Sequence, residues 1–407
     1  MTKPMNKIEK LIEELCPQGV EFKALNEISI ISGAGVDKKI NHDEKHIKLL
    51  NYMDVYRNRY IDCKIPTMEV TASNKKIVQC NILKGDIFFT PTSEVLNDIG
   101  NSAVAINDIS GTVYSYHIMR IRLNEPVFIT AMYINCILES EYVQKQINKN
   151  AKGITRFGLT KTQWEKIKIP IPPLTIQKEI VKILDNFTRL EAELEAELEA
   201  RKKQYDYYRE ELLSFGDDVE FRALGEVCLS ISAGGDLPKK YKKGQRKPTE
   251  EFQYPIYSNG SDEKALYGYT DNYKIDNEAV TISARGTIGY HSVRSAKFTP
   301  IVRLITLIPS IKIITVKFLN YVLDITEIGH SGGSIPQLTV PNVKKIQIPI
   351  PPLSKQKEIV AILDKFDALV NDISTGLPAE ITARKKQYEY YRNQLLTFKP
   401  LELKDAN

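Results

Sequence analysis

The feature that most constrains the fold of this chain is a long stretch that occurs twice. The first copy spans residues 169–215, the second spans 348–398, and both open with IPIPPL. Their front halves match at a spacing of 179 residues, as Pro172 and Pro351 show, and their back halves match at 183, as Tyr205 and Tyr388 show. The second copy is therefore four residues longer. A duplicated stretch gives each copy an obvious packing partner, which is the other copy.

Both copies predict long helices. Each begins after a pair of prolines, which lack the N–H that a helix interior requires, and Thr175 and Ser354 are the expected N-caps. The first copy has no Gly or Pro from 174 to 215 and predicts one helix roughly 60 Å long. Gly376 and Pro378 divide the second copy into two predicted helices. Apolar residues at steps of three, four and seven are expected to pair the helices, namely Ile180, Phe187, Leu194, Tyr205, Tyr208, Ile359, Phe366, Tyr388 and Tyr391.

A second repeat opens each half of the chain. VEFKAL at 20–25 returns as VEFRAL at 219–224, a spacing of 199 residues. Two unlike segments, 26–164 and 225–343, follow these motifs; in each, short strand-like runs and turns are followed by a helix-like piece. The sequence therefore predicts an α+β protein with two mixed α/β domains separated by two long helical repeats. The repeats are expected to form an antiparallel coiled-coil pair in a pseudo-two-fold, circular layout.

The same repeats predict where one structural part of the chain ends and the next begins. The expected parts are an N-terminal helix that completes the helical frame at 1–19, mixed domains at 20–172 and 218–351, helical spacers at 173–217 and 352–400, and a tail at 401–407. Strand-like runs lie at 84–90, 102–106, 112–123, 279–283, 287–293 and 301–308, and helix-like pieces at 129–148 and 316–325.

Composition narrows the class of protein. A chain with 42% hydrophobic and 26% charged residues matches soluble globular proteins, and no apolar stretch is long and uninterrupted enough to span a bilayer. The five cysteines form no CxxC pair, so they indicate neither a disulfide framework nor a zinc ribbon, and they favour a reducing cytoplasm. A net charge of +5 allows a nucleic-acid partner but does not require one.

No catalytic constellation is apparent. The GAG turn at 33–35 begins like a nucleotide-binding turn but lacks the third glycine, so a plain turn is the better interpretation. The chain has no GxxxxGK(S/T) phosphate loop, and His42 and His46 have no third metal ligand near them in the sequence. We therefore expect a protein that is not an enzyme and that uses neither a cofactor nor a metal.

The two variable segments carry basic residues interleaved with aromatic ones. The run PKKYKKGQRKPT at 238–249 has six Lys and Arg and no acid; it could line a phosphate backbone, although a solvated mobile loop has the same composition. An arginine beside a glycine on a tight turn could read a guanine edge or form a surface ion pair. The candidate nucleic-acid contacts are Tyr52, Arg57, Arg59, Ser93, Tyr116, His117, Lys152 and Arg156 in the first segment, and Lys239, Lys240, Lys242, Lys243, Arg246, Asn259, Arg285 and Ser334 in the second.

The order of these motifs resembles a known family. VEF(K/R)AL, a variable segment, IPIPPLxxQKEIVxILDxF and RKKQYxYYR, all present twice, resemble the specificity subunits of type I restriction-modification systems, and the resemblance covers nearly the whole chain. GYTD at 268–271 and SARGTIG at 283–289 are also typical of that family. The resemblance implies that each variable segment is a target-recognition domain for one half of a split, asymmetric site on double-stranded DNA. It also implies that the helical pairing residues dock two methyltransferase (modification) subunits, that restriction subunits then join, and that these partners methylate adenine or cleave DNA.

Given this resemblance, the four-residue repeat LEAELEAELEA at 190–200 is expected to set the distance between the two half-sites. Each unit lengthens a helix by about 6 Å, so one unit should change the gap between half-sites by about one or two base pairs. Two alternatives remain: a coiled-coil adaptor whose variable domains bind proteins, and a self-sufficient restriction or methylation enzyme. Salt-dependent retention on DNA would distinguish a recognition subunit from the adaptor, and a lack of adenosylmethionine binding would count against the enzyme.

Overall fold

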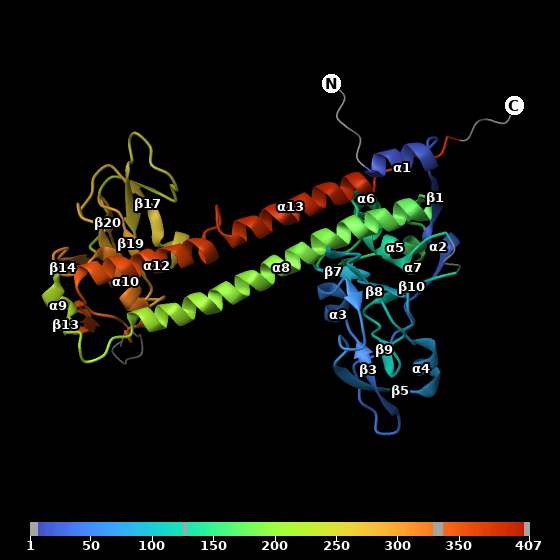
Figure 1. The fold of residues 1–407 in the computed structure, drawn as a ribbon, viewed down its shortest axis with the longest axis horizontal. Coiled ribbons are helices and arrows are strands. Elements are labelled where there is room, and N and C mark those ends of the chain that lie inside the picture. The colour runs from blue at the N-terminus through green and yellow to red at the C-terminus, as the bar shows by residue number, and fades with distance from the viewer. Residues whose placement is uncertain (1–6, 125–127, 329–336, 403–407) are drawn as a thin grey trace. The chain divides into compact units, whose positions relative to one another are not determined.

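The structure is a computed structural model that describes residues 7–124, 128–328 and 337–402 (Figure 1). It forms two compact units. The first unit comprises Met1–Glu193 and Ile381–Asn407, and the second comprises Leu194–Glu380. Helix α8 (Leu174–Leu213) is a single helix of 40 residues that contributes its first half to the first unit and its second half to the second unit. The prediction of one continuous helix in the first repeat is therefore confirmed.

The first unit is built on a five-stranded sheet. Its order is β2 (Ser29–Ser32), β10 (Met119–Leu123), β6 (Ile87–Phe89), β8 (Ser102–Ala105) and β4 (Tyr60–Ile61), antiparallel except for the β4–β8 pair. The central strand β6 is apolar on both faces because both faces are covered. Ile87 and Phe89 join one hydrophobic cluster, while Phe88 joins a second cluster.

The second cluster lies against a three-stranded sheet in the same unit. That sheet has the order β5 (Met68–Ala72), β3 (Lys45–Leu50) and β9 (Thr112–Tyr114). Helix α4 (Asn74–Gln79) follows β5, and helix α3 (Tyr52–Arg57) contacts β6 and β8 of the five-stranded sheet. Each helix has a polar N-cap side chain, Ser73 and Asn51 respectively, that accepts hydrogen bonds from the first turn. A two-stranded pair, β7 (Thr92–Ser93) and β11 (Phe157–Gly158), completes this side of the unit.

Helices cover the other face of the five-stranded sheet. These are α5 (Ala131–Leu138), α6 (Glu141–Asn150), α7 (Lys161–Glu165), the first half of α8, α1 (Lys7–Leu15) and α13 (Leu377–Leu395) from Ile381 onward; the short elements α2 (Leu25–Ile28) and η1 (Leu96–Asp98) connect strands. Every residue of α5 except Met132 is buried. Trp164 on α7 is fully buried, with its ring 4.5 Å from that of Phe89.

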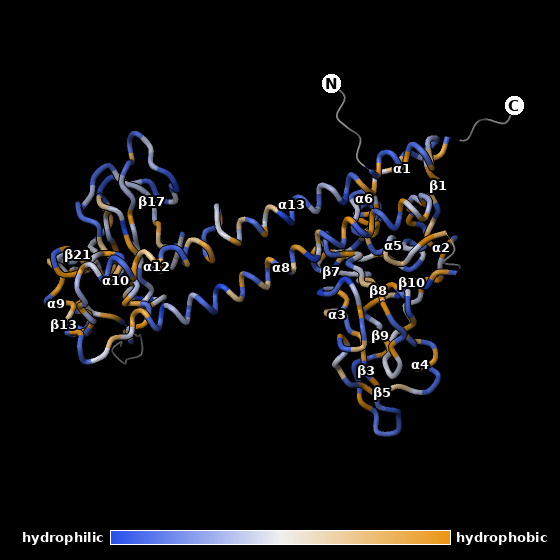
Figure 2. Tube along the Cα trace, in the orientation of Figure 1, coloured by the Kyte–Doolittle hydropathy of each residue, from blue (hydrophilic) through white to orange (hydrophobic). Residues whose placement is uncertain are grey.

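The second unit has two four-stranded sheets. One has the order β14 (Cys228–Ala233), β21 (Ile305–Pro309), β18 (Ala279–Ile282) and β19 (His291–Arg294), all antiparallel. The other has the order β15 (Tyr241–Lys243), β17 (Leu266–Thr270), β16 (Tyr254–Tyr257) and β20 (Thr299–Pro300). The helical elements of the second unit are α9 (Leu224–Val227), η2 (Asp262–Ala265), α10 (Val316–Ile325), α11 (Val340–Lys344), α12 (Leu353–Asn371) and the second half of α8. In Figure 2 the hydrophobic colouring concentrates inside each unit, while the loops near β17 are hydrophilic.

Each unit closes its variable segment with a strand pair made from the two repeated motifs. VEFKAL supplies β1 (Glu21–Ala24), which pairs antiparallel with β12 (Lys168–Ile171) from IKIPI. VEFRAL supplies β13 (Phe221–Ala223), which pairs in the same way with β22 (Gln347–Pro349). The registers agree between the units, since Phe22 lies opposite Pro170 and Phe221 lies opposite Pro349. The two repeats are therefore the two ends of one structural frame, which holds a different insert in each unit.

Several local expectations were wrong, each for an identifiable reason. Thr175 and Ser354 are not N-caps, because α8 and α12 already begin at Leu174 and Leu353. The carbonyl of Pro173 accepts the amides of Ile176 and Gln177, and Pro352 is the N-cap of α12. Proline lacks only the donor, so its carbonyl can still accept the first helical hydrogen bonds. The segment 129–148 forms two helices because Ser140 caps α6. The segment 112–123 forms two strands, β9 and β10.

Candidate nucleic-acid interface

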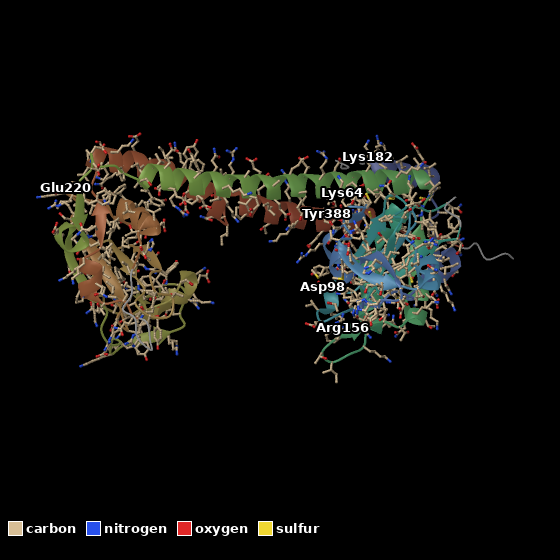
Figure 3. All side chains as sticks on the ribbon, turned by 90° about the horizontal axis from the view of Figure 1, so that it is seen from below. Lys64, Asp98, Arg156, Lys182, Glu220 and Tyr388 are labelled. Carbon is tan, nitrogen blue, oxygen red and sulfur yellow. The ribbon has the colours of Figure 1, made fainter. Side chains whose placement is uncertain are left out.

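Several candidate residues of the first unit meet around one cavity of about 350 Å³. Helix α3 supplies Tyr52 and Tyr56, which lie one turn apart and stack with ring centroids 6.1 Å apart. Strand β7 supplies Ser93, and Arg156 comes from the loop before β11. Figure 3 shows Arg156 and Asp98, another lining residue, on the same side of this unit. Stacked aromatic rings beside an exposed arginine and a hydroxyl group can contact bases and phosphates.

The loop that carries Arg156 is fixed by backbone pairing. Lys152 and Gly158 exchange two backbone hydrogen bonds of 3.1 Å, and the Arg156 Nε donates to Thr92 Oγ1 at 3.0 Å. Gly153 has a φ of 147°, and a Cβ there would lie 1.8 Å from the carbonyl oxygen of Arg156, so only glycine fits. Lys152 and Arg156 are both exposed beside this hairpin, as a contact to DNA requires.

A turn between β9 and β10 presents Tyr116 and His117, whose rings lie 3.9 Å apart. Partial burial, together with the positive charges of Lys38 and Arg156, lowers the pKa of His117, so the ring is neutral at pH 7 and can both donate and accept. The positive charge of Arg156 contributes to lowering the pKa of His117, so the Arg156 loop lies within electrostatic range of this turn. The sequence candidates Tyr52, Ser93 and Arg156 therefore line one cavity, and Tyr116 and His117 lie on the turn between β9 and β10.

Two other candidate residues of the first unit are arginines, Arg57 and Arg59, which differ in their exposure. Arg57 is exposed in the last turn of α3. Arg59 is nearly buried: its Nη1 donates to the Tyr388 hydroxyl at 2.9 Å, and its guanidinium lies 3.3 Å from Asp185 and 3.7 Å from Glu139. The expectation that Arg59 contacts nucleic acid is therefore corrected. Its carboxylate partners and burial make it a link between the variable segment and the helices.

The basic run of the second unit is an ordered strand rather than only a loop. β15 is the edge strand of its sheet and pairs with β17, so that Lys242 and Lys243 are exposed along the edge. The ammonium group of Lys243 lies 5.4 Å from the Tyr267 ring. Arg246 donates to the carbonyl of Glu263 at 2.8 Å, and Lys239 and Lys240 are exposed just before the strand. Two cations of the run therefore lie on a paired edge strand, and the other four flank that strand.

Asn259 was expected to contact nucleic acid, but its side chain is bound to backbone groups of its own unit. Its Oδ1 accepts the Ala284 amide at 2.7 Å, and its Nδ2 donates to the Val302 carbonyl at 2.6 Å. It therefore positions two turns with its side chain. Arg285, on the first of these turns, is exposed and donates to Gln337 Oε1 at 2.8 Å. Ser334 lies outside the described residues.

Sequence reasoning missed Tyr56, whose hydroxyl donates to Asp98 at 3.2 Å. Its spacing of four residues from Tyr52 in a segment that could be helical was a usable signal. Among residues 7–124, 128–328 and 337–402, no group of three His, Cys, Asp or Glu could hold a metal ion. In the same ranges no helix has both the length and the apolar character that crossing a bilayer requires.

The sequence profile described as "Type I restriction modification DNA specificity domain" matches this chain twice, at residues 17–200 and 216–383. The chain belongs to the type I restriction-modification specificity family. A type I specificity subunit of Mycoplasma pneumoniae is 36% identical to it over 273 residues, which are 63% of this chain and 80% of the relative. The specificity subunit of the Escherichia coli restriction enzyme EcoR124I/EcoR124II is 37% identical over 275 residues, 59% of this chain and 67% of the relative.

A solved structure has a similar fold. The crystal structure of the type I specificity (S) subunit of M. genitalium has a TM-score of 0.51 to this chain at 17% identity, and the match covers 93% of this chain and 96% of that one. Within a type I system this chain is accordingly the DNA specificity subunit, a component that catalyses no reaction.

The helical frame of the specificity subunit uses the same aromatic contact twice. In the first unit, Phe187 on α8 stacks on Tyr391 of α13 with ring centroids 5.5 Å apart. In the second unit, Phe366 on α12 stacks on Tyr208 of α8, also at 5.5 Å. Tyr388 and Tyr205 add further ring contacts, at 6.5 and 6.1 Å. Ile180 and Ile359 are fully buried, and Leu194 is half-buried. The long helices α8, α12 and α13 therefore pack together through residues of the repeat.

A buried glutamine fastens each helix start to its variable segment. Gln177 donates to the carbonyls of Phe128 and Pro172, both at 2.8 Å, and accepts the Thr130 amide at 3.0 Å. Gln356 repeats all three contacts with Ile313, Pro351 and Thr315, at 2.9 Å each. Thr130 and Thr315 are the N-caps of α5 and α10. The glutamine therefore ties three backbone segments together in both units.

Proposed function

We propose that this specificity subunit reads a bipartite, asymmetric site on double-stranded DNA, with one half-site for each variable segment. The proposed target-recognition domains are 20–172 and 218–351. The proposed frame consists of the N-terminal helix at 1–19 and the spacers at 173–217 and 352–400, followed by the tail at 401–407. The observation that carries the proposal is the duplicated frame, in which the same strand pair encloses two unlike inserts.

In the first domain we propose that DNA meets the surface formed by Tyr52, Tyr116, His117 and Arg156, with Lys152 and Arg57 beside it. Ser93 is left out of this surface because it is only 7% exposed and its hydroxyl accepts the Val95 amide at 3.2 Å. Exposed cations supply salt-dependent attraction to phosphates, and aromatic and hydroxyl groups supply contacts at base edges. In the second domain the proposed surface consists of the β15 edge with Lys239, Lys240, Lys242, Lys243 and Arg246, together with Arg285.

A binding measurement tests the DNA surface. The complex of this chain with its modification subunit should bind a duplex carrying its site, and Arg156→Ala should weaken binding by about 10-fold to 100-fold. Lys182→Ala is the matched control, because Lys182 is an exposed cation on α8 (Figure 3). Fluorescence anisotropy over a series of salt concentrations gives both affinity and salt slope. A wild-type complex without salt-dependent binding would support the protein-binding adaptor and contradict the proposal.

We further propose that the helices dock two modification subunits, to which restriction subunits are added. Tyr207 on α8 and Tyr390 on α13 occupy equivalent places in the repeat RKKQYxYYR, and they are 62% and 57% exposed. Each packs edge-on against its neighbouring tyrosine with ring centroids 5.4 Å apart. Exposed tyrosines held by a neighbouring ring are suited to anchor an interface, and two equivalent anchors suit two copies of one partner.

The docking proposal predicts a change of stoichiometry. Tyr207→Ala or Tyr390→Ala should each leave one modification subunit bound, and the double variant should bind none. The matched controls are Lys203→Ala and Lys386→Ala, which alter exposed neighbours on the same helices. Native mass spectrometry of the co-purified complexes counts the subunits. Two bound subunits in the double variant would remove the tyrosines from the proposed interface.

A further inference from the structure

We propose that Arg303 is a sequence-reading residue of the second target-recognition domain and that Asn259 positions it together with Arg285 as one reading unit. The inference deepens the proposed function and rests on it. It concerns the turn at 302–303, which lies one residue before β21 and which no sequence motif singled out.

The backbone of this turn has an unusual conformation. Val302 and Arg303 have φ values of 53° and 62°, in the left-handed region that side chains other than glycine rarely adopt. A β-branched residue such as valine is particularly disfavoured there, and Val302 is 53% exposed, so burial of its side chain does not compensate. Strained backbone of this kind persists only where surrounding contacts impose it, and it is concentrated at functional sites.

Three sets of contacts impose the conformation. The amides of Val302 and Arg303 donate to the carbonyls of Gly235 and Gly234, both at 2.9 Å. Gly234 is required there, because a Cβ would lie 2.7 Å from the carbonyl carbon of Pro300. The Val302 carbonyl, in turn, accepts the Asn259 amide at 2.6 Å. The turn is therefore held from both sides.

Asn259 joins this turn to a second one. The Oδ1 atom of Asn259 accepts the Ala284 amide at 2.7 Å and lies 3.3 Å from the Ser283 hydroxyl, at the start of the turn that carries Arg285. One side-chain amide thus fixes the backbone on which both arginines stand. The Arg285 guanidinium is held by Gln337, whereas the exposed side chain of Arg303 makes no hydrogen bond or ion pair with any described residue. Arg303 is therefore free to bind a ligand.

The first domain has a turn at the equivalent place, although Tyr116 and His117 lack the positive φ of Val302 and Arg303. The Tyr116 amide donates to the Val36 carbonyl at 3.1 Å, as that of Val302 does to Gly235, and Val36 and Gly235 occupy the same position after the repeated VEF(K/R)AL motif. Ser115 and Ile301, the residues before these turns, form equivalent parallel bridges to Val36 and Gly235. Tyr116 and His117 therefore correspond to Val302 and Arg303. The equivalent turn already belongs to the proposed DNA surface of the first domain.

The chemistry of Arg303 indicates what it recognises. A guanidinium fork with free donors can bind the O6 and N7 atoms of guanine in the major groove, and a fixed backbone gives the fork a defined direction. The proposed ligand is therefore a guanine-containing base pair in the second half-site.

Methylome sequencing of cells that express the full chain with its modification subunit tests the proposal. Arg303→Ala should relax one base position in one half of the motif, with a drop of about 10-fold to 100-fold in discrimination there and no change in the other half. Asn259→Asp keeps the acceptor for Ala284 but loses the donor to Val302, so it should relax the same position. Arg303→Lys should not restore it, because lysine lacks the fork.

Lys312→Ala is the matched control, because Lys312 is an exposed cation beyond the opposite end of β21. An unchanged motif in Arg303→Ala, or a uniform loss of methylation at every site, would overturn the inference while leaving the specificity subunit's function in place. A wild-type complex that methylates no bipartite motif would instead refute the proposed function itself.

Discussion

At Val302 the backbone has a left-handed conformation that costs a residue other than glycine about 1–2 kcal/mol. Val302→Gly should remove this strain and raise the free energy of unfolding of the second unit by about 1 kcal/mol or leave it unchanged. Val95→Gly is the matched control, because Val95 is 55% exposed but has an ordinary φ of −108°, so glycine there should cost about 0.5–1 kcal/mol. Hydrogen-exchange mass spectrometry in urea measures the change in the free energy of unfolding for both variants. Equal losses in the two variants would contradict the strain argument.

His291 makes the second unit sensitive to pH. Burial lowers the pKa of His291, but the hydrogen bonds to Asp324 at 3.1 Å and to the Gly289 carbonyl at 3.0 Å outweigh burial and raise it. A raised pKa means that the protonated form stabilises the folded state, and this stability is lost as pH rises through the folded pKa. The free energy of unfolding of this unit should therefore fall from pH 6 to pH 8. In His291→Asn the pH dependence should be smaller, as exchange of amides in β19 would show.

At the scale of elements, the glutamine contacts connect helix starts to the rest of each unit. Gln177→Met should lower the free energy of unfolding of the first unit by about 2–4 kcal/mol, because three buried backbone groups lose their partner. Gln394→Met is the matched control on exposed α13 surface and should change it by less than about 0.5 kcal/mol. The single tryptophan, Trp164, is buried in this unit and reports its unfolding by fluorescence in urea. A cost below about 1 kcal/mol would show that water replaces these bonds.

The elements divide into those that local sequence determines and those that it does not. The bounds of α10 and the break between α12 and α13 were predictable, because apolar spacing, glycine and proline act within a few residues. The pairing of β1 with β12 could not be predicted, because about 150 residues separate the strands and no local rule selects partners at that distance. Arg59 was misassigned for the same reason, since its partner Asp185 lies on a helix far along the chain. In the candidate site, residue types were predictable and their grouping was not.

At the scale of the whole molecule, α8 contains the four-residue repeat and contributes to both units. We propose that its length sets the gap between the two half-sites. Deletion of 194–197 should remove about 6 Å of helix and shorten the methylated motif's spacer by about one or two base pairs. Substitution of Glu195 and Glu199 by glutamine, which keeps the length, is the control. A spacer that stays the same after the deletion would contradict the proposal.

The central claim is that two inserts in one duplicated frame read two separate half-sites. Methylome sequencing of cells that express this chain with its modification subunit tests it most directly, when residues 225–343 are exchanged for the corresponding segment of another specificity subunit. The wild type should give a split, asymmetric motif with methylated adenine in both halves, and the exchange should alter one half alone. A continuous motif, or a change in both halves, would contradict the claim.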